Sequence, residues 1–324
     1  MQTEIEKPRA RQRARHRDFL HAILIIAAFA IPIIAALTFY ALFNGSLDSI
    51  QAFGFGFLTG TRWEPNPANG GPPILGALPA MYGSVVTTLI ALIFAVPISL
   101  GIALFQSELA PSRLRLPSIF LIELLAAVPS VVYGLWGILF LVPFMSNYVD
   151  PGLVGSLGFI PIFSGETNGL GMFTAGVILA IMIIPYGAAV MREVIAAVPR
   201  AQREACIALG GTQVETVRMA VIPYASTGII AAIVLAMGRA IGETMAVTMV
   251  IGNVARISPS LFLPSETIPS VIANEFTEVA GSNIYLAALF ELGLILFAIA
   301  FLMNLIGRVL ISKLAFQSGT SAHV

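Results

Sequence analysis

The stretch MYGSVVTTLIALIFAVPISLGIALF, residues 81–105, contains no charged side chain and decides the fold class. As a helix rising about 1.5 Å per residue, it is long enough to cross the roughly 30 Å hydrocarbon core of a bilayer. Inside lipid the backbone must satisfy its own hydrogen bonds, which a helix does within one segment. The stretch therefore predicts a transmembrane helix.

Five further apolar stretches have similar length and character: residues 19–43, 119–145, 172–191, 223–251 and 285–311. Only 10% of the 324 residues are charged and 57% are hydrophobic, whereas soluble chains carry about 25% charged residues. We therefore predict an all-α membrane protein with six transmembrane helices. This composition excludes a cytosolic enzyme, a nucleic-acid-binding protein and a secreted scaffold held by disulfides. The single cysteine, Cys206, cannot form an intrachain disulfide.

Lysine and arginine side chains divide unequally between the two sides of the predicted spans. Fourteen of the 17 fall on one side: Lys7, Arg9, Arg11, Arg13, Arg15, Arg17, Arg113, Arg115, Arg192, Arg200, Arg203, Arg218, Arg308 and Lys313. The opposite connections hold only Arg62 and Arg256. Because cytoplasmic segments carry the excess of basic residues, both termini are expected in the cytoplasm. We expect a basic tail over residues 1–18, which topology alone explains, one transmembrane domain over 19–314 and a cytoplasmic tail over 315–324.

Motifs for covalent catalysis or cofactor binding are missing from the sequence. A phosphate-binding P-loop needs Gly-Lys followed by Ser or Thr, but the two lysines, Lys7 and Lys313, follow Glu6 and Ser312. The three histidines lie near the chain ends and Cys206 stands alone, so no metal-ligand cluster is predicted. We expect that the chain is not an enzyme and carries no cofactor or metal. A passage or receptor function remains.

The fifth stretch contains GRAIGET at residues 238–244, which places Arg239 near the middle of a predicted helix. A central arginine costs roughly 2.5–3.5 kcal/mol on insertion scales, so it is a functional hypothesis by default. Glu243 would share its helix face at four-residue spacing, although cation before anion is the weaker order. Gly238 and Gly242 predict a close approach to a second helix.

Two interpretations of Arg239 stay open. It could form a structural ion pair with Glu243, or it could lie on a path and bind a tetrahedral oxyanion through bidentate hydrogen bonds. In the second case Glu243 would hold Arg239 when the path is empty, and Thr244 and Thr248 would add neutral donors. Ser130, after Pro129, lies where the third helix could open towards a cavity. For Glu123 and Glu291, an interhelical hydrogen bond and a transport role are both reasonable.

The connection between the fourth and fifth spans, about residues 192–222, contains REACIALG at 203–210, and AVIP follows at 220–223. Gly210 and Gly211 are suited to end a short amphipathic helix, and Pro223 to begin the next span. The segment resembles the EAA loop of ABC-importer permeases, with Glu204, Ala205, Gly210 and Pro223 in register. Cys206, Ala220 and Ile222 depart from the family pattern.

In that family the short helix of this loop docks on a cytoplasmic ATPase and transmits its closure. The resemblance implies this coupling role for Glu204, Ala205, Gly210 and Gly211. Residues 123–137 and 238–250, with Trp63-Glu64-Pro65, look similar to the permeases of bacterial phosphate-specific ABC importers, most closely the C-type subunit, and the likeness extends over nearly the whole chain. This implies a type I importer (MetI-like) core formed by spans two to six, preceded by one extra span.

The same resemblance implies a permease subunit of an ATP-driven inorganic phosphate importer that forms half of the translocation path. Its partners would be an A-type sister permease, two ATPase subunits that bind ATP and Mg, a periplasmic phosphate-binding protein and membrane lipid. A permease for sulfate or molybdate stays open, because one arginine does not discriminate among tetrahedral anions. A secondary anion transporter or channel would need no such loop and would show inverted repeats, while a membrane sensor would need no charge within a span.

Overall fold

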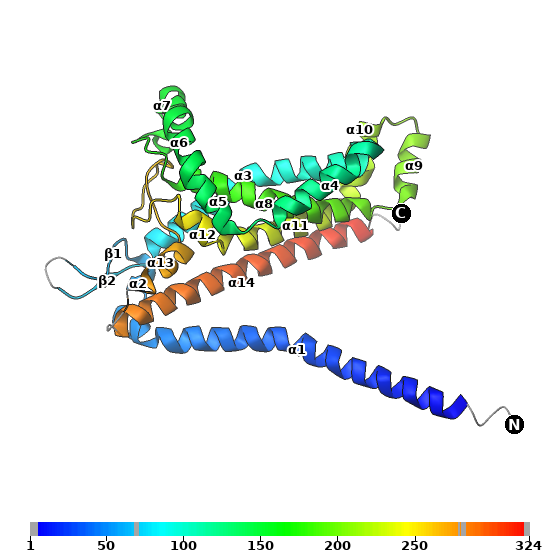
Figure 1. Cartoon of the computed structure of the whole chain (residues 1–324), viewed down its shortest axis with the longest axis horizontal. Helices are drawn as coiled ribbons and strands as arrows, with labels where there is room; N and C mark the ends of the chain where they lie inside the picture. The colour runs from blue at the N-terminus through cyan, green and yellow to red at the C-terminus, as the bar shows by residue number, and fades with distance from the viewer. Residues whose placement is uncertain (1–5, 68–70, 278, 280–282, 321–324) are drawn as a thin grey trace.

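The computed structural model describes residues 6–67, 71–277, 279 and 283–320, and side chains from residue 24 to residue 312 within those ranges. Figure 1 shows an almost entirely helical chain. Its longest helices are α1 (Glu6–Phe53), α3 (Leu78–Leu104), α4 (Ser112–Ala126), α8 (Met172–Ala196), α11 (Ile222–Ile241) and α14 (Asn283–Thr320). Shorter α-helices are α2 (Gly56–Thr59), α5 (Ser130–Trp136), α6 (Val142–Phe144), α7 (Asp150–Leu157), α9 (Arg200–Ala208), α10 (Gln213–Thr216), α12 (Met245–Thr248) and α13 (Ile268–Glu275).

The remaining elements join or extend these helices. The π-helical segments are η1 (Phe105–Leu109), η2 (Gly137–Leu141), η3 (Met145–Val149) and η5 (Val217–Val221), and η4 (Pro161–Phe163) is a 3-10 turn. Strands β1 (Trp63–Glu64) and β2 (Ile74–Leu75) pair antiparallel, with Trp63 opposite Leu75. The described chain is therefore helical at every point where it could cross a membrane.

Six described helical segments are long and apolar enough to span a bilayer, which confirms the predicted number. They are Leu24–Phe53, Leu78–Leu109, Ser130–Leu157, Met172–Ala196, Gln213–Ile241 and Asn283–Ser312. In α8, 61% of the apolar window is buried, against 0% in α1. Helix α8 is therefore the centre of the bundle, and most side chains of the α1 span face outward, towards the lipid in a bilayer.

Helix α8 packs along α3 and α11, and Figure 1 shows these three helices side by side. Ile178, Leu179 and Ile183 of α8 are fully buried in the main core, together with Val247 and Val250 from the region of α12. Helix α1 instead pairs with α14, for example through Phe39 and Phe297, whose ring centroids lie 5.8 Å apart. The first span therefore attaches to the outside of the bundle.

The expected terminal tails are only partly described. Helix α1 already includes residues 6–18, in continuity with the first span, but the side chains of its basic residues lie outside the described set. Helix α14 continues to Thr320, and residues 321–324 are outside the described range.

The predicted third span over residues 119–145 is not one continuous helix. Helix α4 ends at Ala126, and a new helix starts at Ser130 and continues through short α- and π-helical segments to Leu157. Pro129 has no N–H to donate and disfavours a helical conformation at the residue before it, so it separates the two helices. A helix break at Pro129 is therefore confirmed, while residues 119–126 belong to α4, which packs against α8.

The predicted continuous fifth helix over residues 223–251 is wrong. Helix α11 ends at Ile241, residues 242–244 are not helical, and the four-residue α12 follows. Gly242 is a weak helix former, and the Glu243 carboxylate accepts a hydrogen bond from the Ala246 N–H at 3.3 Å. Such side-chain to backbone bonds compete with a continuous helix. Arg239 and Glu243 therefore do not share one helix face.

Candidate functional site

Arg239 lies in the last turn of α11, and its partner is aromatic. Its guanidinium carbon is 5.5 Å from the ring centroid of Tyr186, in the middle of the membrane-spanning helix α8. The hydroxyl of Tyr133 is also within electrostatic range of Arg239 and donates to the Leu125 carbonyl at 2.9 Å. This places Arg239 at mid-span depth, beside the break between α4 and α5.

The expected ion pair between Arg239 and Glu243 is not formed in the described chain. The helix break turns Glu243 towards the backbone of α12 instead. Thr248 donates to the Thr244 carbonyl at 2.7 Å, and Thr244 makes a long 3.4 Å bond to Gly242. Each of these three side chains thus bonds the nearby backbone around the break, and none is hydrogen-bonded to Arg239 in the described chain.

Ser130 is half-buried at the start of α5. This helix packs directly on α12, because a Cβ atom added at Gly134 would lie only 3.1 Å from the Ala246 Cα. The third and fifth spans are both interrupted, and they contact each other through the short helices α5 and α12. Sequence reasoning missed Tyr133 and Tyr186, although a tyrosine within an apolar span brings a polar tip that needs a partner.

The face of α11 that carries Arg239 is open. Arg239 is exposed, and a Cβ atom added at Gly238 would meet nothing within 4 Å in the described chain. The close helix approach expected at Gly238 and Gly242 is therefore not made among the described residues. Since an arginine facing lipid at mid-span is costly, this face must border a polar path or a partner.

The two other in-span acids differ in their surroundings. Glu123 on α4 forms an ion pair with Arg192 at the end of α8, with a distance of 3.2 Å. This contact supports the structural alternative for Glu123. Glu291 on α14 is 6% exposed, and its Oε2 atom has no hydrogen-bond partner among the described residues.

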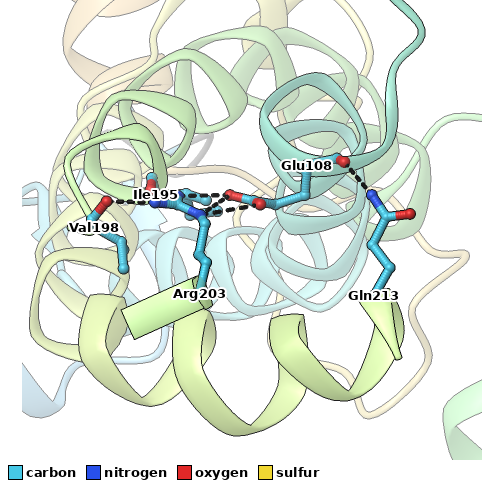
Figure 2. A network of polar contacts seen from close by, with 5 residues as sticks. All are labelled: Glu108, Ile195, Val198, Arg203 and Gln213. Carbon is cyan, nitrogen blue, oxygen red and sulfur yellow. Dashed lines mark hydrogen bonds and ion pairs between the residues drawn. The ribbon is translucent and has the colours of Figure 1, made fainter. Parts of the chain in front are cut away.

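The connection between α8 and α11 forms a compact elbow at one end of the bundle (Figure 1). Its helix α9 is anchored by Arg203, as Figure 2 shows. The Arg203 guanidinium bonds the Glu108 carboxylate, with Nη2 to Oε1 at 2.7 Å and Nε 3.2 Å from each oxygen, and it donates to the carbonyls of Ile195, at 3.0 Å, and Val198. Gln213 donates to the Glu108 carbonyl at 2.6 Å. Glu108 therefore ties both arms of the elbow to the end of the second span.

The opposite face of the elbow is exposed and partly apolar. Glu204 and Ala205 are exposed on α9, and the large apolar side chains of Ile207, Leu209 and Val214 are 59%, 91% and 70% exposed. An apolar cluster on a surface marks an interaction site more often than a single exposed residue does. The elbow thus has an inner face that binds the bundle and an outer face suited to a partner.

Helix α9 ends as the sequence predicts. The Gly211 N–H donates to the Cys206 carbonyl at 3.0 Å and the Gly210 N–H to the Ile207 carbonyl at 2.9 Å, the pairing of a Schellman motif. Gly210 has φ +86, a conformation that costs a residue with a side chain roughly 1–2 kcal/mol.

This geometry predicts the outcome of two substitutions at Gly210. Because a Cβ there would meet nothing within 4 Å, only the backbone conformation opposes a side chain. We expect Gly210→Val to lower ATP-stimulated transport severalfold, and Gly210→Asn to be nearly neutral, since asparagine tolerates this conformation. Uptake by the assembled complex measures the difference, and equal activity of the two variants would contradict the expectation.

The chain matches a known family of proteins. Residues 95–316, which contain both the elbow and Arg239, match the family described as the inner membrane component of binding-protein-dependent transport systems. The chain belongs to this family. It is therefore a multi-pass inner membrane protein, and the match begins within the second span, which leaves α1 outside it.

Similar members of the family carry a common name. The chain is 45% identical to the phosphate transport system permease protein PstC of Pasteurella multocida, over 93% of each chain. It is 42% identical to the PstC protein of Mesorhizobium japonicum, over 92% of this chain and 91% of the relative. Among solved structures, the inward-facing MetNI methionine ABC transporter superposes with a TM-score of 0.54 at 15% identity, covering 72% of this chain and 93% of that one. The last comparison confirms the expected MetI-like fold.

Proposed function

We propose that this chain is a permease subunit of an ATP-driven inorganic phosphate importer and that Arg239 lies on the translocation path. The exposed guanidinium at mid-span carries the proposal, because it needs an anionic or polar counterpart that the described chain does not provide. The names of the relatives support phosphate as that anion. A guanidinium suits a tetrahedral oxyanion, since two of its N–H groups can bond two oxygens at once.

The residues around the helix break would assist passage without trapping the anion. The hydroxyls of Thr244, Thr248 and Ser130 would be neutral donors to the anion. Those of Thr244 and Thr248 donate to backbone carbonyls in this arrangement and would have to rotate towards the path. Glu243 is held by the α12 backbone, so it does not neutralise Arg239 in this arrangement. Tyr186 covers one side of the guanidinium with its ring face, which weakly favours the cation. The path would therefore hold its positive charge ready for an incoming anion.

The partners follow from the two open surfaces. An A-type sister permease would cover the face of Gly238 and Arg239 and so complete the path. The exposed face of the elbow, with Glu204, Ala205, Gly210 and Gly211 at its helix and turn, would dock on one of two ATPase subunits. ATP and Mg would bind in those subunits, so this chain would have no catalytic residue and no cofactor. A periplasmic phosphate-binding protein would deliver phosphate to the outer segments.

The proposed topology places both termini and the elbow in the cytoplasm. Six spans return the chain to the side where it began, and Figure 1 shows the C-terminal end of α14 at the same end of the bundle as α9. The excess of basic residues in the same segments supports this orientation.

Uptake of labelled phosphate by the reconstituted complex tests the transported ion. We expect ATP-dependent, saturable uptake that an excess of sulfate or molybdate leaves nearly unchanged. A complex without ATP is the control. If sulfate or molybdate suppressed uptake as strongly as unlabelled phosphate does, the chain would belong to an importer for another oxyanion.

A further inference from the structure

A small polar pocket lies in the outer segment between the fifth and sixth spans, outside the proposed path. Its volume is about 200 Å³. Its walls are formed by Asn253, Glu266, Ser270, Val271, Asn274 and Glu275. Four of these residues, from Ser270 to Glu275, belong to α13, so one short helix forms most of the pocket wall. None of the lining residues is cationic, and two are acids.

Glu266 is the unusual member of this pocket. It is only 5% exposed, and its buried Oε1 atom has no hydrogen-bond partner among the described residues. A buried carboxyl oxygen without a partner is costly, and native structures seldom retain one without a bound ion, a water or another explanation. Glu266 lines the pocket, and its unpartnered carboxyl oxygen points to an electropositive ligand there.

The other donors are arranged around the same space. Glu275 accepts hydrogen bonds from the Trp63 indole, at 2.6 Å to Oε2, and from the Tyr285 hydroxyl. Both donors are neutral, so no ion pair in the described chain compensates the carboxylate charge. The Asn253 amide nitrogen donates to the Thr248 carbonyl at 2.8 Å, which leaves its oxygen as the acceptor of that side chain. Asn253 also has φ +51, so a special backbone conformation holds its amide in place.

We propose that this pocket binds a hard divalent cation such as Ca²⁺ or Mg²⁺, with Glu266 and Glu275 as carboxylate ligands and the amide oxygens of Asn253 and Asn274 as neutral ligands. All four candidate ligands offer oxygen, the element that both ions prefer. Two carboxylates match a double positive charge, and the volume leaves room for the waters that such ions retain. The proposal does not depend on which anion the chain transports.

A cation here would connect separate parts of the outer surface. Asn253 is bonded to Thr248 at the end of α12, Glu275 is bonded to Trp63 from the first outer segment, and Glu266 precedes α13. One ion would therefore join the helix after the break to two outer segments. We expect this link to stabilise the outer end of the bundle.

Terbium luminescence of the purified, assembled complex tests the site. Tb³⁺ prefers the same oxygen ligands, and the Trp63 indole, bonded to Glu275, lies close enough to sensitise its emission. We expect saturable emission that Ca²⁺ competes away, at least tenfold weaker binding in Glu266→Gln and a severalfold loss in Asn274→Ala. Glu64→Gln is the matched control, because Glu64 is an exposed acid next to Trp63, and it should bind as the parent does.

The melting temperature gives a second measurement that does not depend on luminescence. Added Ca²⁺ should raise it in the parent and in Glu64→Gln, but not in Glu266→Gln. Unchanged Tb³⁺ binding in both Glu266→Gln and Asn274→Ala would overturn the proposal. So would the absence of any Ca²⁺ effect on the melting temperature of the parent. If Glu266→Gln weakened only the capture of the periplasmic binding protein, the pocket would take a basic side chain and not a metal.

Discussion

Arg239→Gln is expected to abolish phosphate uptake while the complex still assembles. Glutamine retains hydrogen-bonding capacity but removes the positive charge and the bidentate fork. Hydrogen bonds to a charged group contribute about 1.5–3 kcal/mol each, so the loss of two predicts a fall in uptake of at least a hundredfold. The packing loss is small, because Arg239 is exposed and its described partner is one tyrosine ring, worth about 0.5–1 kcal/mol.

Two further variants separate a path role from a structural one. Arg256→Gln removes an exposed arginine on the outer side and should leave uptake unchanged. Arg239→Lys retains the charge without the planar fork and should restore only part of the uptake. Normal uptake by Arg239→Gln would contradict the path role. Loss of the assembled complex in that variant would instead assign Arg239 to the contact with a partner subunit.

The bundle could be predicted from the sequence because lipid imposes a simple rule. Any segment that crosses must be apolar and helical over a fixed length, so six apolar stretches gave six spans. Pro129 could also be recognised as a candidate break, since proline removes a backbone donor, but Pro97 and Pro185 lie inside continuous helices, so a proline alone does not locate a break. The ends of the spans could be predicted less closely, because a helix can extend beyond its apolar stretch: α1 continues through Ser46 and Ser49 to Phe53.

The break in the fifth span could not be predicted in the same way. It contains no proline, and its residues, Gly242-Glu243-Thr244, are tolerated in membrane helices. What ends α11 is local: Gly242 is a weak helix former, and the Glu243 carboxylate accepts a hydrogen bond from the Ala246 N–H three residues further on. A helical wheel therefore paired Arg239 with Glu243, whereas the folded chain pairs Arg239 with Tyr186 of another helix. Contacts between distant segments leave no regular spacing in the sequence.

The elbow shows the same limit. Its helix and glycine turn could be predicted because helix capping depends on neighbouring residues. Glu204 belongs to the same short amphipathic helix and is exposed. Its anchor was missed because Glu108 lies 95 residues from Arg203 in the chain. An acid at the end of the second span and an arginine beside a coupling motif are each unremarkable alone. Only the structure brings them together (Figure 2).

That anchor leads to the second large effect: Glu108→Gln is expected to uncouple ATP hydrolysis from uptake. The Arg203 and Glu108 side chains are only 20% and 12% exposed, and their forked contact resists rotation of α9 relative to the spans. Glutamine keeps one amide oxygen for Arg203 but removes the charge and the second acceptor of the fork, a loss of about 1–3 kcal/mol for a guanidinium that stays largely buried beside the carbonyls of Ile195 and Val198. The exposed docking face would be unchanged, so the ATPase should still bind and hydrolyse ATP.

The measurement is the ratio of phosphate transported to ATP hydrolysed, with and without the loaded binding protein. We expect Glu108→Gln to lower this ratio at least tenfold, and Glu193→Gln, an exposed acid at the end of α8, to leave it unchanged. Glu204→Arg should act differently, because a reversed charge on the outer face would weaken ATPase docking itself. The exchanged pair Glu108→Arg with Arg203→Glu should recover part of the ratio. If Glu108→Gln transported with the parent ratio, the elbow would transmit force without this anchor, through the backbone connections of α8 and α11 alone.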